Sequence, residues 1–234
     1  MAAMSFLELV NRTRRECGVS SSEPVTLQTG LTTEQTRFKD WVNDAWIDVQ
    51  VSRDDWLWMR GTVQFDTVAG TYNYTPASAG VTNLGDWRRK SFRCWITAQG
   101  APTEQILPFM EYDTWRNVYQ FANMRTTQWR PAVFTVMPDR SLSTGPLPDA
   151  AYTIYGEYHR APVSLSADAD SPSGSVNGMP ERYQMLVVYK AMKAYGMFAA
   201  AAEVVERATR EESRLMKQLI VFSLPTITSG PPLA

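Results

Sequence analysis

Apolar residues recur every three or four positions in two stretches near the start of the chain, and each stretch opens with a capping box. Ser5 and Glu8 open the first stretch, and Gly18 supplies a stop signal at its end. Thr32 and Gln35 open the second, whose apolar stripe is Phe38, Trp41, Val42, Ala45, Trp46 and Val49. The spacing predicts two amphipathic helices, the second longer than the first.

Four tryptophans fall within residues 40–60, in "DWVNDAWIDVQVSRDDWLWMR". Trp41 and Trp46 lie on the apolar stripe of the second helix, which favours core packing over a ligand-stacking platform. Trp56 and Trp58 follow a charged segment where the pattern changes to alternation. We expect these two residues to pack where the chain leaves the helix for a strand.

Residues 61–162 alternate between β-branched or aromatic residues and polar ones. "TVQFDTV" and "TYNYTP" flank a glycine-containing turn and predict a hairpin. Further strands are predicted at residues 92–98, 104–109, 133–137 and 152–158, with a short helix at 113–121. Because the strands follow one another without long intervening helices, the insertion is expected to be antiparallel.

Helical patterning returns after a polar linker. Pro180 suits a first helical turn, and the run that follows is apolar on almost every side, which predicts a buried helix that Gly196 breaks or kinks. A last helix over residues 200–222 places Glu203 beside Arg207 and Glu206 beside Arg210. Its inward positions are Val204, Val205, Ala208, Leu215, Met216 and Leu219.

The C-terminal segment "SLPTITSGPPLA" cannot be helical because of its prolines, so it is expected to be extended. It is either disordered or an arm that docks on a neighbour. The residues that would make that contact are Leu224, Pro225, Ile227, Pro231 and Leu233.

Together these elements predict an α+β fold: a helical bundle of about four helices with an antiparallel β-rich insertion and an extended C-terminal arm. Residues 1–60 and 175–222 are assigned to a discontinuous helical domain and residues 61–162 to the insertion. Residues 163–174 are the expected linker, and residues 223–234 are the arm.

Composition narrows the function. The formal net charge is −1, so the chain has no overall basic field to hold nucleic acid. The N-terminus has no signal-peptide pattern and no apolar run is long enough to span a bilayer, so synthesis in a cytoplasm and no membrane contact are expected. Cys17 and Cys94 match no zinc or redox spacing and are expected to be buried thiols.

Candidate chemistry is sparse. His159 is the one histidine of the sequence, no serine sits in a G-x-S-x-G motif, and no glycine-rich phosphate loop is present. The carboxylate pairs Asp54–Asp55 and Asp168–Asp170 are interpreted as solvated loop charge. We therefore expect no enzymatic activity, no metal site and no cofactor.

Two clusters combine basic and aromatic residues. The first, in "DWRRKSFRCW", contains Trp87, Arg88, Arg89 and Lys90, and the second, in "RTTQWRP", contains Trp129 and Arg130. Tryptophan with arginine is typical of protein interfaces, and it can also stack on bases and grip phosphates. A subunit contact is favoured, with solvated surface and DNA contact as the alternatives.

The order of these motifs resembles the head-to-tail adaptor, or connector, proteins of tailed bacteriophages. The resemblance rests on "FKDWVNDAWIDVQVSRDDWLWMR", "FDTVAGTYNYTP", "PDAAYTIYGEYHRAPVSLSADADSP" and "MPERYQMLVVYKAMKAYGMF", which occur in the family's order and together span most of the chain.

The resemblance implies a virion structural protein at the head–tail junction, made in the cytoplasm of a bacterial host. Its partners would be copies of itself in a ring, usually a dodecamer, then the portal protein and a downstream tail or nozzle protein. The ring would extend the DNA channel, touch the genome transiently, and serve its packaging, retention and ejection. The C-terminal arm would bind the portal or a neighbouring subunit.

Two other functions compete with this one. A carbohydrate-binding or glycosidase module would need Trp87, Trp95 or Trp129 exposed in a groove. A DNA-binding accessory protein would bind with steeply salt-dependent affinity through Arg88, Arg89 and Lys90.

Overall fold

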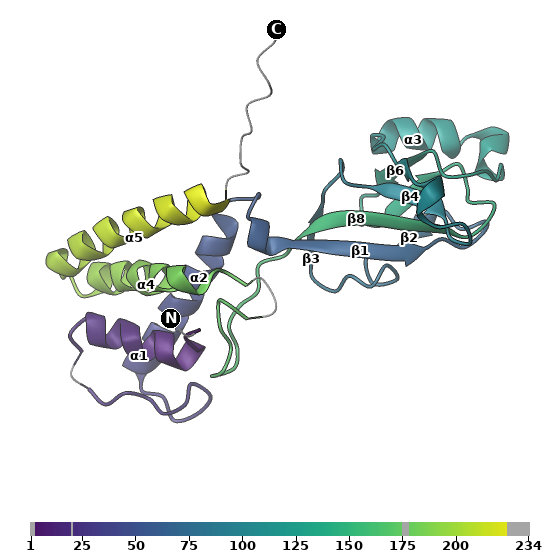
Figure 1. The fold of residues 1–234 in the computed structure, drawn as a ribbon. Coiled ribbons are helices and arrows are strands. Elements are labelled where there is room, and N and C mark those ends of the chain that lie inside the picture. The colour runs from purple at the N-terminus through teal and green to yellow at the C-terminus, as the bar shows by residue number, and fades with distance from the viewer. Residues whose placement is uncertain (1–2, 20, 175–177, 224–234) are drawn as a thin grey trace, which may run out of the picture. The chain divides into compact units, whose positions relative to one another are not determined.

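The first two helices begin at the predicted capping boxes. In the computed structural model, which describes residues 3–19, 21–174 and 178–223, α1 spans Phe6–Glu16 and α2 spans Thr33–Val51 (Figure 1). The Ser5 amide donates to the Glu8 carboxylate at 2.8 Å, and the Thr32 amide donates to the Gln35 side-chain oxygen at 2.9 Å. Each pair satisfies helix-end donors reciprocally, so both helix starts follow from local sequence.

The described chain divides into two compact units, one helical and one β-rich, which together make an α+β protein. The helical unit contains the residues up to Met59 and those from Pro162 onward, and the β unit is Arg60–Ala161. The later helices of the helical unit are η4 (Glu181–Tyr183), α4 (Met185–Phe198) and α5 (Ala202–Ser223).

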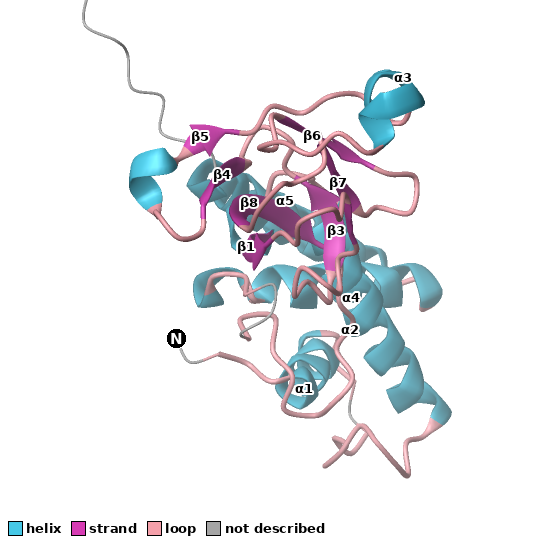
Figure 2. Cartoon of the chain, turned by 90° about the vertical axis from the view of Figure 1, so that its right-hand side faces the viewer, coloured by secondary structure: helices cyan, strands magenta, loops and turns pink. Residues whose placement is uncertain are grey.

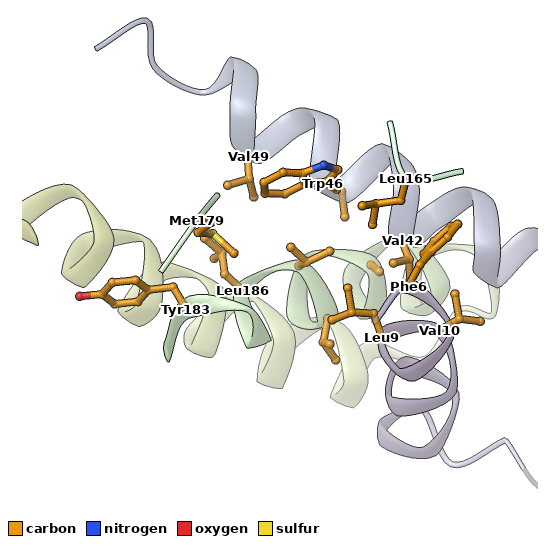
Figure 3. Packing of buried hydrophobic residues seen from close by; sticks show 14 of the residues in the cluster. Phe6, Leu9, Val10, Val42, Trp46, Val49, Leu165, Met179, Tyr183 and Leu186 are labelled. Atoms are coloured by element: carbon orange, nitrogen blue, oxygen red, sulfur yellow. The ribbon is translucent and has the colours of Figure 1, made fainter. Parts of the chain in front are cut away.

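Helix α4 is the central element of the helical unit and packs against α1, α2 and α5. Leu186, Val187 and Val188 of α4 are fully buried, as the nearly continuous apolar run predicts. Figure 3 shows Leu186 in one apolar interior with Phe6 of α1 and Trp46 of α2. Burial of these side chains is the main stabilising term of the unit.

The tryptophans of the opening stretch belong to this interior. Trp46 stacks on Trp58 with ring centroids 5.7 Å apart, and Trp58 stacks on Trp56 at 5.6 Å. The indole nitrogen of Trp56 donates to the carbonyl of Val49 at 2.9 Å, so the most deeply buried ring has a polar partner. Trp58 lies in the short helix η1 (Leu57–Met59) rather than in a strand.

Gly196 does not break α4, which continues through it to Phe198. A Cβ atom at this position would lie 2.7 Å from the Cγ2 atom of Val205 in α5. The glycine therefore permits the close approach of α5, and the predicted interruption is wrong because packing overrides the low helix propensity.

The β unit contains two antiparallel sheets (Figure 2). In the larger one, β8 pairs with β1, β3 and β4, and β5 pairs with β4. In the smaller one, β7 lies between β2 and β6. The bounds are β1 (Arg60–Asp66), β2 (Asn73–Tyr74), β3 (Leu84–Trp87), β4 (Arg93–Ile96), β5 (Gln105–Ile106), α3 (Tyr112–Tyr119), β6 (Val133–Val136), β7 (Leu142–Gly145) and β8 (Tyr152–Arg160).

The predicted hairpin is wrong. β1 pairs along its whole length with β8, while β2 pairs with β7 in the other sheet. Between them, the amide of Gly70 donates to the carbonyl of Pro148 at 2.8 Å, and the Tyr74 hydroxyl donates to the carbonyl of Thr71 at 2.6 Å. These bonds hold the turn that connects the two sheets. β1 pairs with β8 rather than with β2 because β8 is the longer strand and can pair with β1 along its whole length.

Asp168 and Asp170 are structural rather than merely solvated. The Asp168 carboxylate accepts from the Thr26 hydroxyl at 2.6 Å and from the Leu27 amide at 2.9 Å. The Asp170 carboxylate accepts the Ala167 amide at 2.7 Å, and its carbonyl accepts the Phe6 amide at 2.6 Å. The segment after β8 is thereby attached to the rest of the helical unit.

These bonds predict an acid-sensitive helical unit. The Thr26 hydroxyl lowers the pKa of Asp168 and the Ala167 amide lowers that of Asp170. A lowered folded pKa gives stability that is present above the ordinary carboxyl pKa of about 3.9 and is lost as the pH falls through the folded value. Replacing both residues by asparagine should lower the unfolding temperature at pH 7, and the difference from wild type should shrink as the pH falls below about 4. Thermal unfolding followed by circular dichroism checks this, and a constant difference at all pH values would contradict it.

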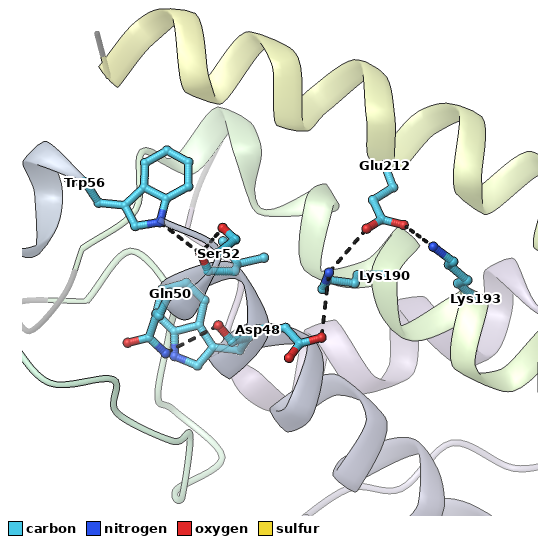
Figure 4. A network of polar contacts seen from close by, with 9 residues as sticks. Asp48, Gln50, Ser52, Trp56, Lys190, Lys193 and Glu212 are labelled. Carbon is cyan, nitrogen blue, oxygen red and sulfur yellow. Dashed lines mark hydrogen bonds and ion pairs between the residues drawn. The ribbon is translucent and has the colours of Figure 1, made fainter. Parts of the chain in front are cut away.

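Ion pairs on α5 also differ from the predicted ones. Arg207 pairs with Glu16 of α1, and Arg210 lies 3.6 Å from Glu211. The predicted pairing with Glu203 and Glu206 is wrong. For Arg207, a carboxylate of another helix outcompetes the exposed neighbour on α5. Figure 4 shows a further network across the helices, in which Lys190 of α4 contacts Glu212 of α5 at 3.3 Å and Asp48 of α2 at 3.7 Å.

Candidate assembly surfaces

Trp87 belongs to the core of the β unit. Only 2% of it is exposed, and its indole nitrogen donates to the carbonyl of Arg140 at 2.8 Å. Its ring meets Phe92 and Tyr158 edge-on at 5.9 and 6.0 Å. The side chain is therefore inaccessible to a partner, and its assignment to a subunit or DNA contact is corrected to core packing. The four residues of β3 show no regular alternation of apolar and polar positions, so the local sequence contains no signal that Trp87 lies inside.

The basic residues after Trp87 lie on the surface of the β unit. Arg88 contacts the Glu157 carboxylate at 2.6 Å, and Arg89 lies over the Phe109 ring at 4.5 Å with Glu111 at 3.5 Å. Lys90 is exposed. Two of the three cations thus have carboxylate partners within their own unit, which reduces the positive charge available to a phosphate backbone.

The second basic–aromatic cluster also has one exposed side chain and one that points into the β unit. Trp129 is 69% exposed, and its backbone amide donates to the carbonyl of Leu147 at 2.7 Å. Arg130 turns inward, donating to the carbonyls of Thr103 and Cys94 and lying over the Tyr152 ring at 5.9 Å. Trp129 remains a candidate contact residue, whereas Arg130 holds the β unit together.

An apolar surface on α3 and the following turn η3 (Ala122–Arg125) was not anticipated from the sequence. Val118, Phe121 and Met124 are 44%, 69% and 38% exposed. Phe121 borders a shallow pocket of about 500 Å³ that is also lined by Arg116 and Arg125. Exposed aromatic residues beside arginine are typical of interface anchors.

The helical unit has a comparable surface where the described chain ends. Phe222 is 49% exposed and Val221 is 70% exposed. The Arg182 guanidinium lies over two neighbouring rings, 4.3 Å from that of Phe222 and 4.8 Å from that of Tyr183. These side chains line a pocket of about 620 Å³ with Lys217 and Gln218. The predicted arm residues Leu224, Pro225, Ile227, Pro231 and Leu233 follow directly in sequence but lie outside the described residues.

The cysteine thiols are poor nucleophiles. Burial, reinforced by Glu16, raises the pKa of Cys17 to about 12, and burial also raises the pKa of Cys94. Within residues 3–19, 21–174 and 178–223, no three His, Cys, Asp or Glu side chains cluster as metal ligands would. Over the same residues, no helix is long and apolar enough to cross a membrane.

The carbohydrate-binding interpretation needs an aromatic platform. Trp87 is buried and Trp95 is only partly exposed, so of the three candidates only Trp129 is largely exposed. The two pockets on α3 and the one beside Phe222 are lined mainly by arginine, lysine, amide and aromatic side chains, and none of these three is lined by a carboxylate pair. These surfaces suit contact with protein better than sugar hydrolysis.

Two units with separate cores carry exposed surfaces in which aromatic side chains lie beside arginine, a composition typical of protein interfaces. The family model described as SU10 adaptor protein matches residues 4–222, nearly the whole chain. The chain therefore belongs to the SU10 adaptor protein family, a family of phage head-to-tail adaptors. A comparison with curated proteins found no match.

Proposed function

We propose that this protein is the ring-forming subunit of a bacteriophage head–tail adaptor. Twelve copies bind the portal, continue the DNA channel below it, and present the attachment surface for the next tail or nozzle protein. The protein is located at the head–tail junction of the virion, after synthesis in the bacterial cytoplasm. It acts mechanically and not as an enzyme, holding packaged DNA and letting it pass during ejection.

Family membership over residues 4–222 is the observation that carries this proposal. The exposed side chains agree with it. Phe121, Trp129 and Phe222 are 69%, 69% and 49% exposed, which is costly in a protein that has no partner. Contact with copies of the chain and with other virion proteins would cover them.

The proposal is tested by mixing the full-length protein with the portal ring of the same phage. Sedimentation velocity should show the chain joining the portal, and negative-stain images should show a second ring of twelve-fold symmetry beneath it. A chain that fails to join the portal at micromolar concentration would overturn the proposal. Duplex DNA serves as the competing ligand, and binding to DNA without binding to the portal would favour the accessory-protein alternative.

The C-terminal arm is proposed to make the portal or neighbour contact through Leu224, Pro225, Ile227, Pro231 and Leu233. Ending the chain after Ser223 should weaken portal binding by about a hundredfold, since apolar anchors at an interface contribute several kcal/mol together. The thermal unfolding temperature should stay unchanged, because every core residue that the structure describes in the helical unit remains. A matched control replaces Thr228 and Ser229 by alanine and keeps the apolar residues. Undiminished portal binding by the truncated chain would show that the arm is dispensable.

A further inference from the structure

A row of four cations runs along the outer face of α5. Arg207, Arg210, Arg214 and Lys217 are spaced by three, four and three residues, which puts them on one helix face, and all four are exposed. We call them the basic row. The carboxylates that its members contact are Glu16 and Glu211, the latter 2.9 Å from Arg214. Two carboxylates against four cations leave the row positive.

A row of three carboxylates runs along the outer face of α2. Asp40, Asp44 and Asp48 follow one another at intervals of four and are exposed. We call them the acidic row. Asp48 contacts Lys190 at 3.7 Å, and among the described residues no ion pair involves Asp40 or Asp44. Like charges at this spacing destabilise a helix, so the acidic row lowers the stability of α2 in the isolated chain.

The two rows belong to helices on either side of α4. α4 packs against both α2 and α5, and Figure 4 shows it between them, with Lys190 reaching Asp48 in one direction and Glu212 in the other. The buried faces of α2 and α5 carry Phe38, Val42, Ala208 and Leu215, and the exposed rows lie on other faces of the two helices. At the edge of each row, Asp48 and Arg207 also reach Lys190 of α4 and Glu16 of α1. One copy therefore presents an acidic helix and a basic helix on separate surfaces.

We propose that the basic row of one copy docks on the acidic row of the next copy. This inference rests on the proposed function, because a ring is closed by heterologous contacts in which two different surfaces of the subunit meet. At a rise of about 1.5 Å per residue, the acidic row is about 12 Å long and the basic row about 15 Å, so the lengths match. Each row ends near an exposed valine, Val51 on α2 and Val221 on α5, which adds an apolar contact to the charged one.

Two charge-reversal variants of the full-length chain test the docking. The first carries Asp40→Lys and Asp44→Lys, and the second carries Arg210→Glu, Arg214→Glu and Lys217→Glu, so that each substituted row changes the sign of its net charge. Each variant alone brings like charges together at every contact, so self-association or loading on the portal should weaken at least about tenfold. An equimolar mixture should restore it, because alternating copies pair unlike rows in any ring with an even number of subunits. The control, Asp54→Lys with Glu181→Lys, changes the net charge as the first variant does but outside both rows.

The measurement is sedimentation velocity at low and at high ionic strength, on the chain alone and with portal rings, with circular dichroism to confirm folding. Rescue by the mixture, and a defect of each single variant that shrinks as salt is added, would support the docking. Variants that load on the portal in wild-type number would overturn the docking while leaving the proposed function intact. A wild-type chain that neither self-associates nor loads would overturn both.

Duplex DNA is the other partner that a basic helix face could take. If the Arg210→Glu, Arg214→Glu, Lys217→Glu variant loses affinity for DNA but assembles like wild type, the basic row faces the genome and the docking is wrong. The equimolar mixture distinguishes the two cases directly. If the basic row binds DNA, the lysines in the acidic row of the first variant cannot restore the DNA affinity that the second variant has lost.

Discussion

Replacing Trp46 by alanine is expected to destabilise the helical unit by about 3–5 kcal/mol. Trp46 is 2% exposed and stacks on Trp58 at 5.7 Å, so its removal leaves a cavity that rigid neighbours on α1 and α4 cannot fill. The loss is a large part of the 5–15 kcal/mol, approximately, that stabilises a typical domain. A population of unfolded helical unit would follow, and with it reduced loading on the portal.

Hydrogen exchange resolved by residue measures this prediction. Protection should fall in α1, α2, α4 and α5 and change little in β1 and β8, because the two units have separate apolar cores. Trp129→Ala is the matched control, since Trp129 is 69% exposed and its loss should change unfolding by less than about 0.5 kcal/mol. Equal effects of the two substitutions would mean that Trp46 is not a packing residue.

The contrast between these two tryptophans bears on function. A ligand platform would need its rings exposed, whereas Trp46, Trp56, Trp87 and Trp115 are each at most 2% exposed. These four tryptophans therefore stabilise the core of the unit to which each belongs. Trp129 is the tryptophan that projects into solvent, and its loss should affect assembly without affecting stability.

Local signals explain which elements could be predicted. The capping boxes at Ser5 and Thr32 act over three residues, and the apolar stripe of α2 extends over about three helical turns, so neither depends on the distant chain. The buried helix α4 could be predicted because its run is too apolar for any exposed face. Such features can be read from a single short stretch of the sequence.

Pairings between distant segments account for the failures. The turn around Gly70 has the composition of a hairpin, yet β1 pairs with β8, about ninety residues later in the chain. Arg207 likewise reaches Glu16 rather than its own helical neighbour. In both cases, a partner that is distant in sequence outcompetes the local one, and no short window contains that information.

The sequence predicted only part of the candidate assembly surfaces, because the exposure of a side chain also depends on contacts between distant segments. The composition of "DWRRK" indicates a surface cluster, but Trp87 packs against Phe92 and Tyr158 in the core, and the three cations lie outside. The apolar surface at α3 consists of Val118, Phe121 and Met124. These side chains are exposed because no other segment of the β unit covers them. The rows on α2 and α5 are visible in the sequence, but their positions on either side of α4 are not.

Replacing Gly156 by alanine is expected to destabilise the β unit by about 1–3 kcal/mol. Gly156 lies in the middle of β8, which pairs with three other strands, and a Cβ atom there would be 2.5 Å from the Cε1 atom of Phe92. Contact between carbon atoms is favourable only near 3.5–4.0 Å, approximately, so a side chain or the backbone must move. Phe92 cannot move freely, because it is buried and its ring lies 4.4 Å from that of Phe134.

A double-mutant cycle with Phe92→Leu shows whether this contact is the cause. Phe92→Leu alone should destabilise by creating a cavity, but in the presence of alanine at position 156 it should cost less, because the shorter side chain makes room for the new methyl group. The expected coupling is about 0.5–3 kcal/mol, measured by urea unfolding with hydrogen exchange assigning the loss to the β unit. Additive effects would place the strain elsewhere in β8. The favourable coupling would instead show that the absence of a side chain at Gly156 is what lets Phe92 and Phe134 pack against the strand that joins the larger sheet.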